Sequence, residues 1–301
     1  MENSVKADRF VGHLIWALIG SQKVSCALIS IQHFGATVSN GFLKKMNENP
    51  LVSLQNITKN FGSLTALDGV CLNIYSGQVL ALVGDNGAGK STLIKILSGA
   101  HAQTSGSLLV NGKETLLDSP RKATDVGVAT IYQELAIANN LTVIENVFLG
   151  REITKNYFGI PVMQSDKMRE CVTKLMDEIE ATIDDLDAMV GALSGGQRQA
   201  VAICRALHLS AKLVIMDEPT AALAVAETEK VLKIIKRLAN QQTAVILISH
   251  NIQNVFEVAD RICVLRQGKL IAELTKTETS PEEVVGYITG AHESLRAEKL
   301  M

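Results

Sequence analysis

From residue 51 onward the apolar residues fall into short runs separated by glycines and polar turns, a pattern typical of a chain that mixes strands with helices. Alternation of strands with helices favours a parallel sheet that is covered on both faces. The Asn111-Gly112 turn signal predicts an antiparallel patch beside it. Strands are expected where the runs are short and rich in β-branched residues, at 51–57, 66–75, 79–83, 107–110, 126–131, 213–216, 243–248, 261–265 and 269–274.

Helical spacing of apolar residues marks the connections between these strands. The segment from 142 to about 181 is expected to be mostly helical, because Thr142 and Glu145 fit a capping box and the apolar residues of 165–179 recur at helical spacing. No internal repeat is visible, which predicts one domain and not a tandem pair. Further helices are expected at 93–97 with Gly99 as C-cap, 200–207, 227–240, 252–258 and 281–289.

Composition excludes several classes of function. The chain has 301 residues, 47% of them hydrophobic and 20% charged, so it can bury a large core. A net charge of −2 gives no support for nucleic-acid binding, which usually needs a basic stripe. The acidic cluster Asp184, Asp185 and Asp187 is interpreted as a solvated loop and not a metal site. Five scattered cysteines are expected to be reduced packing residues: Cys26, Cys71, Cys171, Cys204 and Cys263.

The first stretch with candidate chemistry follows the strand at 79–83. It is a phosphate-binding P-loop pattern, GxxxxGK[ST], made of Gly84, Asp85, Asn86, Gly87, Ala88, Gly89, Lys90, Ser91 and Thr92. The glycines let backbone N–H groups converge on phosphate oxygens at a helix N-terminus, Lys90 can reach the β and γ oxygens, and Ser91 can ligate Mg²⁺. The alternative is a glycine turn before a core helix, and the flanking strand and helix disfavour it.

Two further stretches suit the same chemistry. The strand at 213–216 ends in Asp217, which suits a Mg²⁺ contact, and Glu218, which suits general-base work on a water molecule. Two solvated acids at a strand end are the alternative. Residues 194–196, Ser-Gly-Gly, precede a predicted helix and offer a second anion-binding helix N-terminus, although such a stretch alone is usually a flexible turn.

In order and spacing these motifs resemble those of the ATP-binding subunits of ABC transporters, from about Leu51 to Gly290. Gln133 matches the Q-loop, LSGGQ at 193–197 the signature, LVIMDE at 213–218 Walker B, and His250 the switch histidine. The resemblance implies an α/β fold with a P-loop NTPase (RecA-like) core, an antiparallel β subdomain and an inserted α-helical signature subdomain. The ATP-binding domain would cover 50–290, with the helical subdomain at about 134–205.

The resemblance also implies how the site works. Two copies would close head to tail, so that each ATP lies between the P-loop of one copy and Ser194, Gly195, Gly196 and Gln197 of the other. Gln133 would contact Mg²⁺ and the attacking water and couple to a membrane subunit, and His250 would contact the γ-phosphate. Phe61 would stack on adenine. Taken alone, Phe61 could be a core residue and His250 an ordinary strand-end histidine. Implied roles are catalytic for Glu218, His250, Gln133 and Lys90, and Mg²⁺-binding for Ser91, Gln133 and Asp217.

Longer stretches, such as IKILSGAHAQTSGSLLVNGK and LSGGQRQAVAICRAL, resemble the monosaccharide importers of this family. That resemblance implies an ATP hydrolase at the cytoplasmic face of the membrane, working as a homodimer on a transmembrane permease and indirectly with a substrate-binding protein. One departure is Ala224, which follows 221–223 where the family's D-loop has an aspartate. Alternatives are a soluble ABC ATPase with protein or ribosome partners and a regulator that binds ATP without hydrolysis. Glu218 and His250 disfavour the regulator.

Residues 1–49 follow a different pattern. Their apolar runs, 10–20 and 24–31, are each too short to cross a bilayer, which takes about 20 apolar residues. They imitate a secretory signal, but export is not expected of a domain that uses cytosolic ATP. The segment is interpreted as an atypical leader, non-native or disordered, with Met46 as the real start, or as an apolar segment that lies on a membrane or partner. Deleting 1–45 is expected to leave nucleotide binding intact, and 291–301 is expected to be a C-terminal tail.

Overall fold

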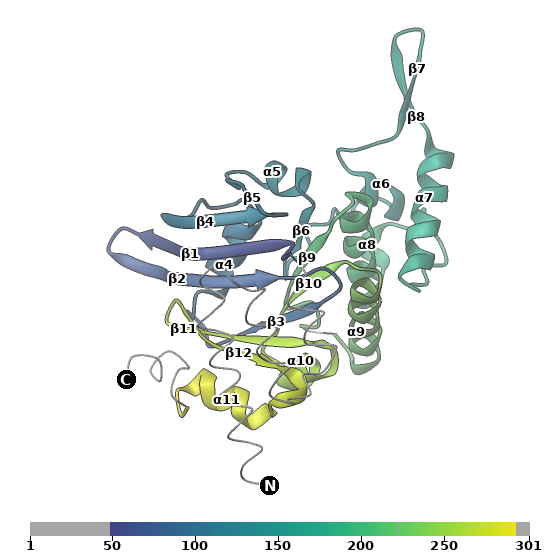
Figure 1. Ribbon diagram of the computed structural model, residues 1–301. Coiled ribbons are helices and arrows are strands. Elements are labelled where there is room, and N and C mark those ends of the chain that lie inside the picture. The colour runs from purple at the N-terminus through teal and green to yellow at the C-terminus, as the bar shows by residue number, and fades with distance from the viewer. Residues whose placement is uncertain (1–48, 222, 293–301) are drawn as a thin grey trace, which may run out of the picture. The chain divides into compact units, whose positions relative to one another are not determined.

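Two sheets organise the part of the chain that the computed structural model describes, residues 49–221 and 223–292 (Figure 1). The predicted leader, apart from residue 49, lies outside the described residues, as do Cys26, Ala222 and the predicted tail beyond residue 292. No helix in these described ranges is long and apolar enough to cross a membrane.

The central sheet has the strand order β12-β11-β3-β10-β9-β6. All neighbours pair in parallel except β12, which returns from β11 through the turn at Gln267-Gly268. Every residue of β3 and β10 is buried, as expected for strands covered on both faces. The predicted parallel sheet is confirmed. Its strands are β3 (Val79–Val83), β6 (Val128–Ile131), β9 (Leu213–Asp217), β10 (Ala244–Ile248), β11 (Arg261–Arg266) and β12 (Lys269–Thr275).

The second sheet is antiparallel, with the order β2-β1-β4-β5, and confirms the predicted patch. Asn111 and Gly112 join β4 to β5 with φ angles of 51° and 74°, the left-handed pair that a two-residue hairpin turn needs. Its strands are β1 (Val52–Phe61), β2 (Leu64–Ile74), β4 (Ser105–Val110) and β5 (Lys113–Glu114). The first of them runs four residues beyond its predicted end, so that Phe61 is its last residue.

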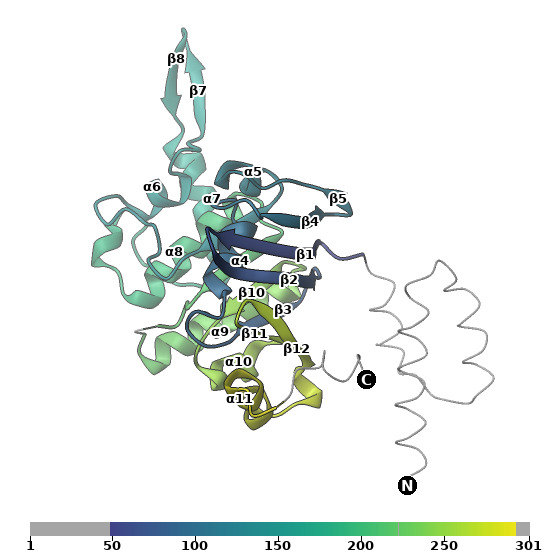
Figure 2. The same cartoon turned by 90° about the vertical axis from the view of Figure 1, so that its left-hand side faces the viewer.

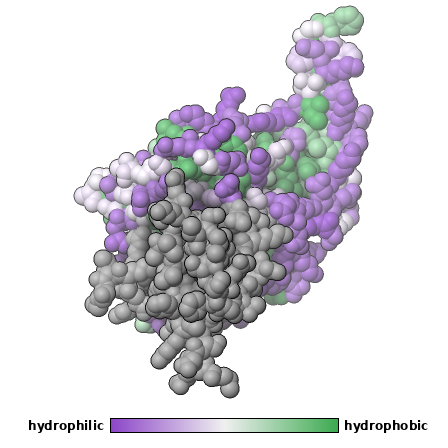
Figure 3. All heavy atoms as spheres, in the orientation of Figure 1, coloured by the Kyte–Doolittle hydropathy of each residue, from purple (hydrophilic) through white to green (hydrophobic). Residues whose placement is uncertain are grey.

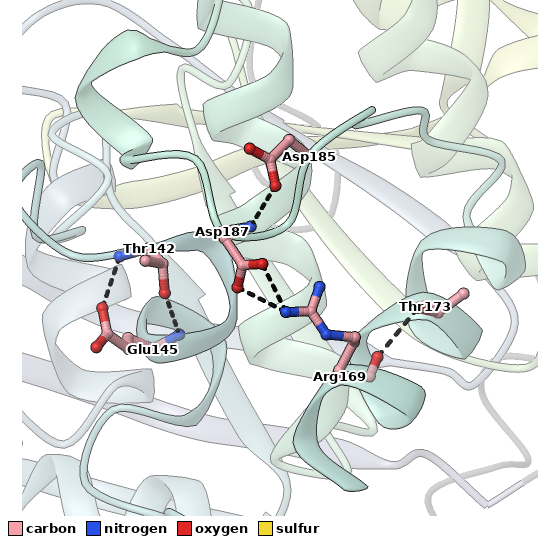
Figure 4. A network of polar contacts seen from close by, with 6 residues as sticks. All are labelled: Thr142, Glu145, Arg169, Thr173, Asp185 and Asp187. Atoms are coloured by element: carbon pink, nitrogen blue, oxygen red, sulfur yellow. Dashed lines mark hydrogen bonds and ion pairs between the residues drawn. The ribbon is translucent and has the colours of Figure 1, made fainter. Parts of the chain in front are cut away.

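A helical part packs α8 (Gly195–His208) against α6 (Val143–Phe148), α7 (Ser165–Glu178) and α9 (Val225–Asn240). Met168, Val172 and Met176 of α7 are buried in a shared core, which confirms that the stripe is core packing. The capping box of α6 is also present. Thr142 Oγ1 accepts from the Glu145 N–H at 3.2 Å, and Glu145 Oε2 accepts from the Thr142 N–H at 2.8 Å (Figure 4).

The expectation of a mostly helical segment from 142 to about 181 is wrong in its middle. Strands β7 (Thr154–Tyr157) and β8 (Ile160–Met163) form a hairpin that projects from the helical part in both views (Figures 1 and 2). Gly159 and Pro161 are the physical reason, because glycine supplies the turn and proline breaks a helix. Apolar side chains gather towards the hairpin tip (Figure 3), and its exposed apolar residues are Tyr157, Phe158, Ile160, Val162 and Met163.

The acidic cluster is a loop that holds α7, as Figure 4 shows. Arg169 Nη2 donates to Asp187 Oδ1 at 2.7 Å and to Oδ2 at 2.6 Å, and Asp185 Oδ1 accepts from the backbone N–H of Asp187 at 2.9 Å. In the described ranges, no group of three or more histidine, cysteine or acidic side chains could hold a metal ion. Asp184, Asp185 and Asp187 are exposed residues outside any helix or strand, which confirms the interpretation as a solvated loop.

Helices α4, α10 and α11 follow their predicted boundaries closely. Helix α4 (Lys90–Leu97) has Ser98 as its C-cap, one residue before the predicted Gly99, which follows with a φ of 73°. Helix α10 (Ile252–Val258) and helix α11 (Pro281–Thr289) match their predicted bounds. Cys204 and Cys263 are buried and free, and burial raises the pKa of the Cys263 thiol to about 12. Helix α5 (Pro120–Asp125) and the short 3₁₀ turns η1 (Val190–Ala192) and η2 (Lys276–Glu278) complete the described elements.

Candidate functional site

The loop between β3 and α4 has a backbone that only glycine can follow at its two ends. Gly84 and Gly89 have φ angles of 150° and 105°. A β-carbon on Gly84 would lie 2.1 Å from the Leu265 carbonyl oxygen, and one on Gly89 would lie 2.7 Å from the carbonyl oxygen of Ala66. Gly87 has open space around it and needs glycine only for its φ of 79°. The loop is thus a tight curl that begins at a buried strand and ends at a helix N-terminus.

The side chain of Lys90 binds two carbonyl oxygens on the inner side of this loop. Its Nζ donates to the carbonyl oxygens of Gly84 at 2.6 Å and Asp85 at 2.9 Å. Burial lowers the pKa of Lys90, and the neighbouring carboxylates Glu218, Asp85 and Asp217 act in the opposite direction. The loop therefore holds a buried ammonium group beside the first-turn N–H groups of α4, an arrangement that attracts phosphate.

Two parallel strands bring acids and a histidine to the same edge of the sheet. Strand β9 ends at Asp217, and β10 is followed by Ser249 and His250. Glu218 has a φ of 50°, and its N–H donates to the Ile248 carbonyl at 3.0 Å, so the backbone turns immediately after β9. A glutamate in the left-handed region is strained, and such strain is concentrated at functional sites.

Glu218 is the most informative residue of the site. His250 Nε2 lies 3.4 Å from Glu218 Oε1, an ion-pair distance, but this oxygen is buried and has no hydrogen-bond partner among the described residues. Burial raises the pKa of Glu218 and of Asp217, whereas His250 and Lys90 lower both. A buried carboxylate oxygen without a partner is costly, so it is expected to meet a ligand or a water molecule.

The donor set fits a divalent cation. Asp217 and Ser91 offer a carboxylate and a hydroxyl oxygen beside the P-loop, and oxygen is the donor that Mg²⁺ prefers. Gln133 follows β6 and lines a cavity of about 250 Å³ together with Glu218. The structure therefore brings Lys90, Asp217, Glu218 and His250 together, with Gln133 at the same cavity as Glu218.

Phe61 lies at the end of β1, with 43% of its surface exposed. Its ring meets His101 edge to face, with 5.6 Å between the ring centroids, and Lys59 Nζ lies 5.0 Å from its centroid. It is therefore not a core residue. The exposed ring is free to stack on a planar group.

Sequence reasoning missed two residues beside the site. Gln199 is 3% exposed, its Nε2 has no hydrogen-bond partner among the described residues, and it lines the same cavity as Gln133 and Glu218. Its place two residues after the LSGGQ stretch was the available signal. Glu227, in the first turn of α9, also lines this cavity. Nothing in the local sequence distinguishes Glu227 from an ordinary helix-capping acid.

The signature residues stand at the start of α8, and one of them, Gly195, lines the same cavity as Glu218. Ser194 caps α8: its Oγ accepts from the Gln197 N–H at 3.3 Å, and Gln197 Oε1 accepts from the Ser194 N–H at 3.0 Å. Helix α8 belongs to the helical part, whereas α4 packs against β2 (Figure 1). A cavity of about 710 Å³ is lined by Ser194, Gly196 and Gln197 at the start of α8 and by residues of α9.

Comparison with known proteins agrees with this geometry. A model of the family described as ABC transporter matches residues 67–221. The chain is 47% identical over 239 residues to the xylose/arabinose import ATP-binding protein XylG of Sulfolobus acidocaldarius, covering 79% of this chain and 94% of that protein. It is 41% identical over 245 residues to the ribose import ATP-binding protein RbsA of Yersinia pestis, covering 81% of this chain but only 47% of that protein.

Among solved structures, the dimeric post-hydrolysis state of the ATP-binding cassette MJ0796 bound to ADP and Pi is similar. The two chains are 28% identical with a TM-score of 0.63, over 75% of this chain and 98% of that one. The expected α/β P-loop fold, with its antiparallel and helical parts, is confirmed. On these grounds the chain belongs to the ABC transporter family.

Proposed function

We propose that this chain is the ATP-hydrolysing subunit of an importer of simple sugars. The observation that carries the proposal is the buried Oε1 of Glu218, which has no hydrogen-bond partner among the described residues and lies close to His250 and to Lys90 of the P-loop. The names of the relatives, which are import proteins for xylose, arabinose and ribose, favour this function over a soluble ABC ATPase with other partners.

In the proposed reaction, Lys90 and the N–H groups of α4 bind the triphosphate, and Phe61 stacks on adenine. Glu218 accepts a proton from water while the water oxygen bonds to the γ-phosphorus and the bond to the β–γ bridging oxygen breaks, which gives ADP and phosphate. His250 orients the γ-phosphate. Asp217, Ser91 and Gln133 would hold Mg²⁺, which when bound neutralises developing charge on the phosphate oxygens.

A second copy of the chain would complete each site. One chain carries its signature at the start of α8, in the helical part, where Ser194, Gly195, Gly196 and Gln197 would be available to the ATP of a partner. A related cassette is dimeric with ADP and Pi, which supports this assembly. Ala224 replaces the D-loop aspartate, so contacts between the copies would rest on other residues.

The permease partner would dock beside Gln133. Tyr132 and Leu135, which flank it, also line a second cavity of about 200 Å³ between β6 and α8, where a segment of another protein could bind. The protein would thereby act at the cytoplasmic face of the membrane, with a substrate-binding protein delivering the sugar to the permease. Copurification with the permease, followed by a screen of sugars for stimulated ATP hydrolysis, tests the substrate class.

Glu218→Gln tests the reaction itself. The variant should bind ATP normally, lose about 10²- to 10⁴-fold in turnover, and accumulate as an ATP-bound dimer. Phosphate release, nucleotide binding and light scattering measure the three effects. Near-normal hydrolysis by this variant would remove Glu218 from the role of base.

A further inference from the structure

Glu227 lies against the two glycines of the signature. A β-carbon on Gly195 would be 3.5 Å from Glu227 Oε2, and one on Gly196 would be 3.3 Å from Glu227 Cβ. Glu227 also lines both the cavity of about 710 Å³ and the cavity of about 250 Å³ that reaches Glu218. Its carboxylate therefore stands where α8 begins, between the signature and the catalytic carboxylate's cavity.

This carboxylate lies at the N-termini of two helices, beside the start of α8 and in the first turn of α9. A hydrogen bond with the Ser194 side chain is the main cause that lowers the pKa of Glu227, and the backbone N–H groups of Gly196 and Ala224 act in the same direction. Ala224 caps α9 without a side-chain hydrogen bond. One carboxylate thus interacts favourably with the positive N-terminal ends of both α8 and α9.

The donors that Glu227 uses are limited in number. A serine hydroxyl has one proton and a backbone N–H group has one. Ser194 Oγ already accepts from the Gln197 N–H, and its hydroxyl proton is the one donor that this side chain can offer to an anion. A phosphate that reaches this helix N-terminus needs the same donors, and it carries the same sign of charge.

We propose that Glu227 is a positioning residue that occupies the signature's anion site until the γ-phosphate of the partner's ATP displaces it. The inference rests on the proposed nucleotide sandwich between two copies. Lys230, one turn further along α9, lines the same large cavity and attracts the Glu227 carboxylate. The displaced carboxylate therefore has a cation three residues away to pair with.

The test measures ATP-driven dimer formation in the Glu218→Gln background, which prevents turnover. Glu227→Gln keeps the shape of the side chain and removes its charge, so half-maximal dimerisation should need about tenfold less ATP, a change equivalent to about 1.4 kcal/mol. Glu229→Gln is the matched control, because Glu229 is exposed on the same helix and lines neither cavity. It should leave the ATP requirement unchanged.

The dependence on salt concentration distinguishes charge repulsion by Glu227 from a purely structural role of this residue. Between 0.05 and 0.5 M NaCl, values on either side of physiological ionic strength, the difference between Glu227→Gln and its parent should shrink, because screening weakens charge repulsion. Thermal unfolding verifies that the variant is folded, and Glu227→Ala replaces it if it is not. An unchanged or higher ATP requirement for Glu227→Gln overturns the inference. Failure of the Glu218→Gln parent to dimerise at any ATP concentration instead overturns the proposed sandwich.

Discussion

At the scale of single residues, the P-loop tolerates no side chain at its first glycine. Gly84→Ala places a β-carbon 2.1 Å from the Leu265 carbonyl oxygen, so β11 or the loop must move. We expect the variant to lose about 3 kcal/mol of unfolding free energy or more, together with ATP binding.

Gly87→Ala is the matched comparison, because no atom of the described residues lies within 4 Å of the added carbon. The positive φ of 79° is the only unfavourable feature for alanine at this position, and it should lower the unfolding free energy by about 1–2 kcal/mol. Denaturant unfolding of both variants measures the difference. Equal losses would show that backbone strain, and not the contact with Leu265, decides the choice of glycine.

The ionised side chain of Glu218 should destabilise the folded protein. Burial raises its pKa in the folded state, so the ionised carboxylate destabilises the fold at any pH above its ordinary pKa of about 4.3. Glu218→Gln should therefore raise the melting temperature at pH 7 in the absence of nucleotide. The gain should fade as the pH drops through the folded pKa and vanish below about pH 4, where the wild-type carboxyl is protonated in both states.

Thermal unfolding across pH 4 to 8 measures this effect. Asp217→Asn should also raise the melting temperature at neutral pH, because burial also raises the pKa of Asp217. A melting temperature for Glu218→Gln that is lower than wild type at neutral pH would contradict the argument.

Much of the site could be predicted from sequence because its residues follow strand ends. Lys90, Asp217 and His250 each come directly after a buried apolar strand or the loop that leaves one, and parallel strands carry their ends to one edge. Glu227 and Gln199 could not, since their places depend on how α8 packs against α9 and β6. The roles of all these residues in ATP chemistry stay predictions.

At the scale of elements, the β7–β8 hairpin is the place where helical periodicity predicted the wrong structure. The residues on either side of it do form α6 and α7, but the hairpin has no Asn-Gly signal of the kind found between β4 and β5. Its turn is Phe158-Gly159, with φ angles of 51° and 87°, nearly the geometry of Asn111-Gly112. Phenylalanine adopts the left-handed region reluctantly, so the local sequence conceals the turn.

Phe158→Asn should therefore stabilise the hairpin by up to about 1 kcal/mol and remove its most exposed apolar side chain. Slower hydrogen exchange at the amides of β7 and β8 would report the gain, and ATP binding should not change. Asn111→Phe is the reverse substitution in a turn of the same geometry, and it should speed exchange in β4 and β5. Faster exchange in the Phe158→Asn hairpin would contradict the account.

At the scale of the whole molecule, the described part of the chain has three regions with separate tasks. The central sheet places the side chains proposed to be catalytic, the antiparallel sheet carries Phe61, and the helical part carries the signature. The order of these regions along the chain could be predicted from the motifs. Their contacts could not, because the cavities beside Gln133 and Ser194 form only when α8 packs between other elements.

The P-loop and the signature belong to different parts of one chain, and this predicts what happens when two inactive variants are mixed. A chain damaged at Lys90 and a chain damaged at Ser194 should each be inactive as a homodimer. Mixed in equal amounts, they should complement each other, because half of the randomly formed dimers contain one composite site in which both halves are intact. About a quarter of the wild-type sites should return, and mixing two Lys90 variants should restore none.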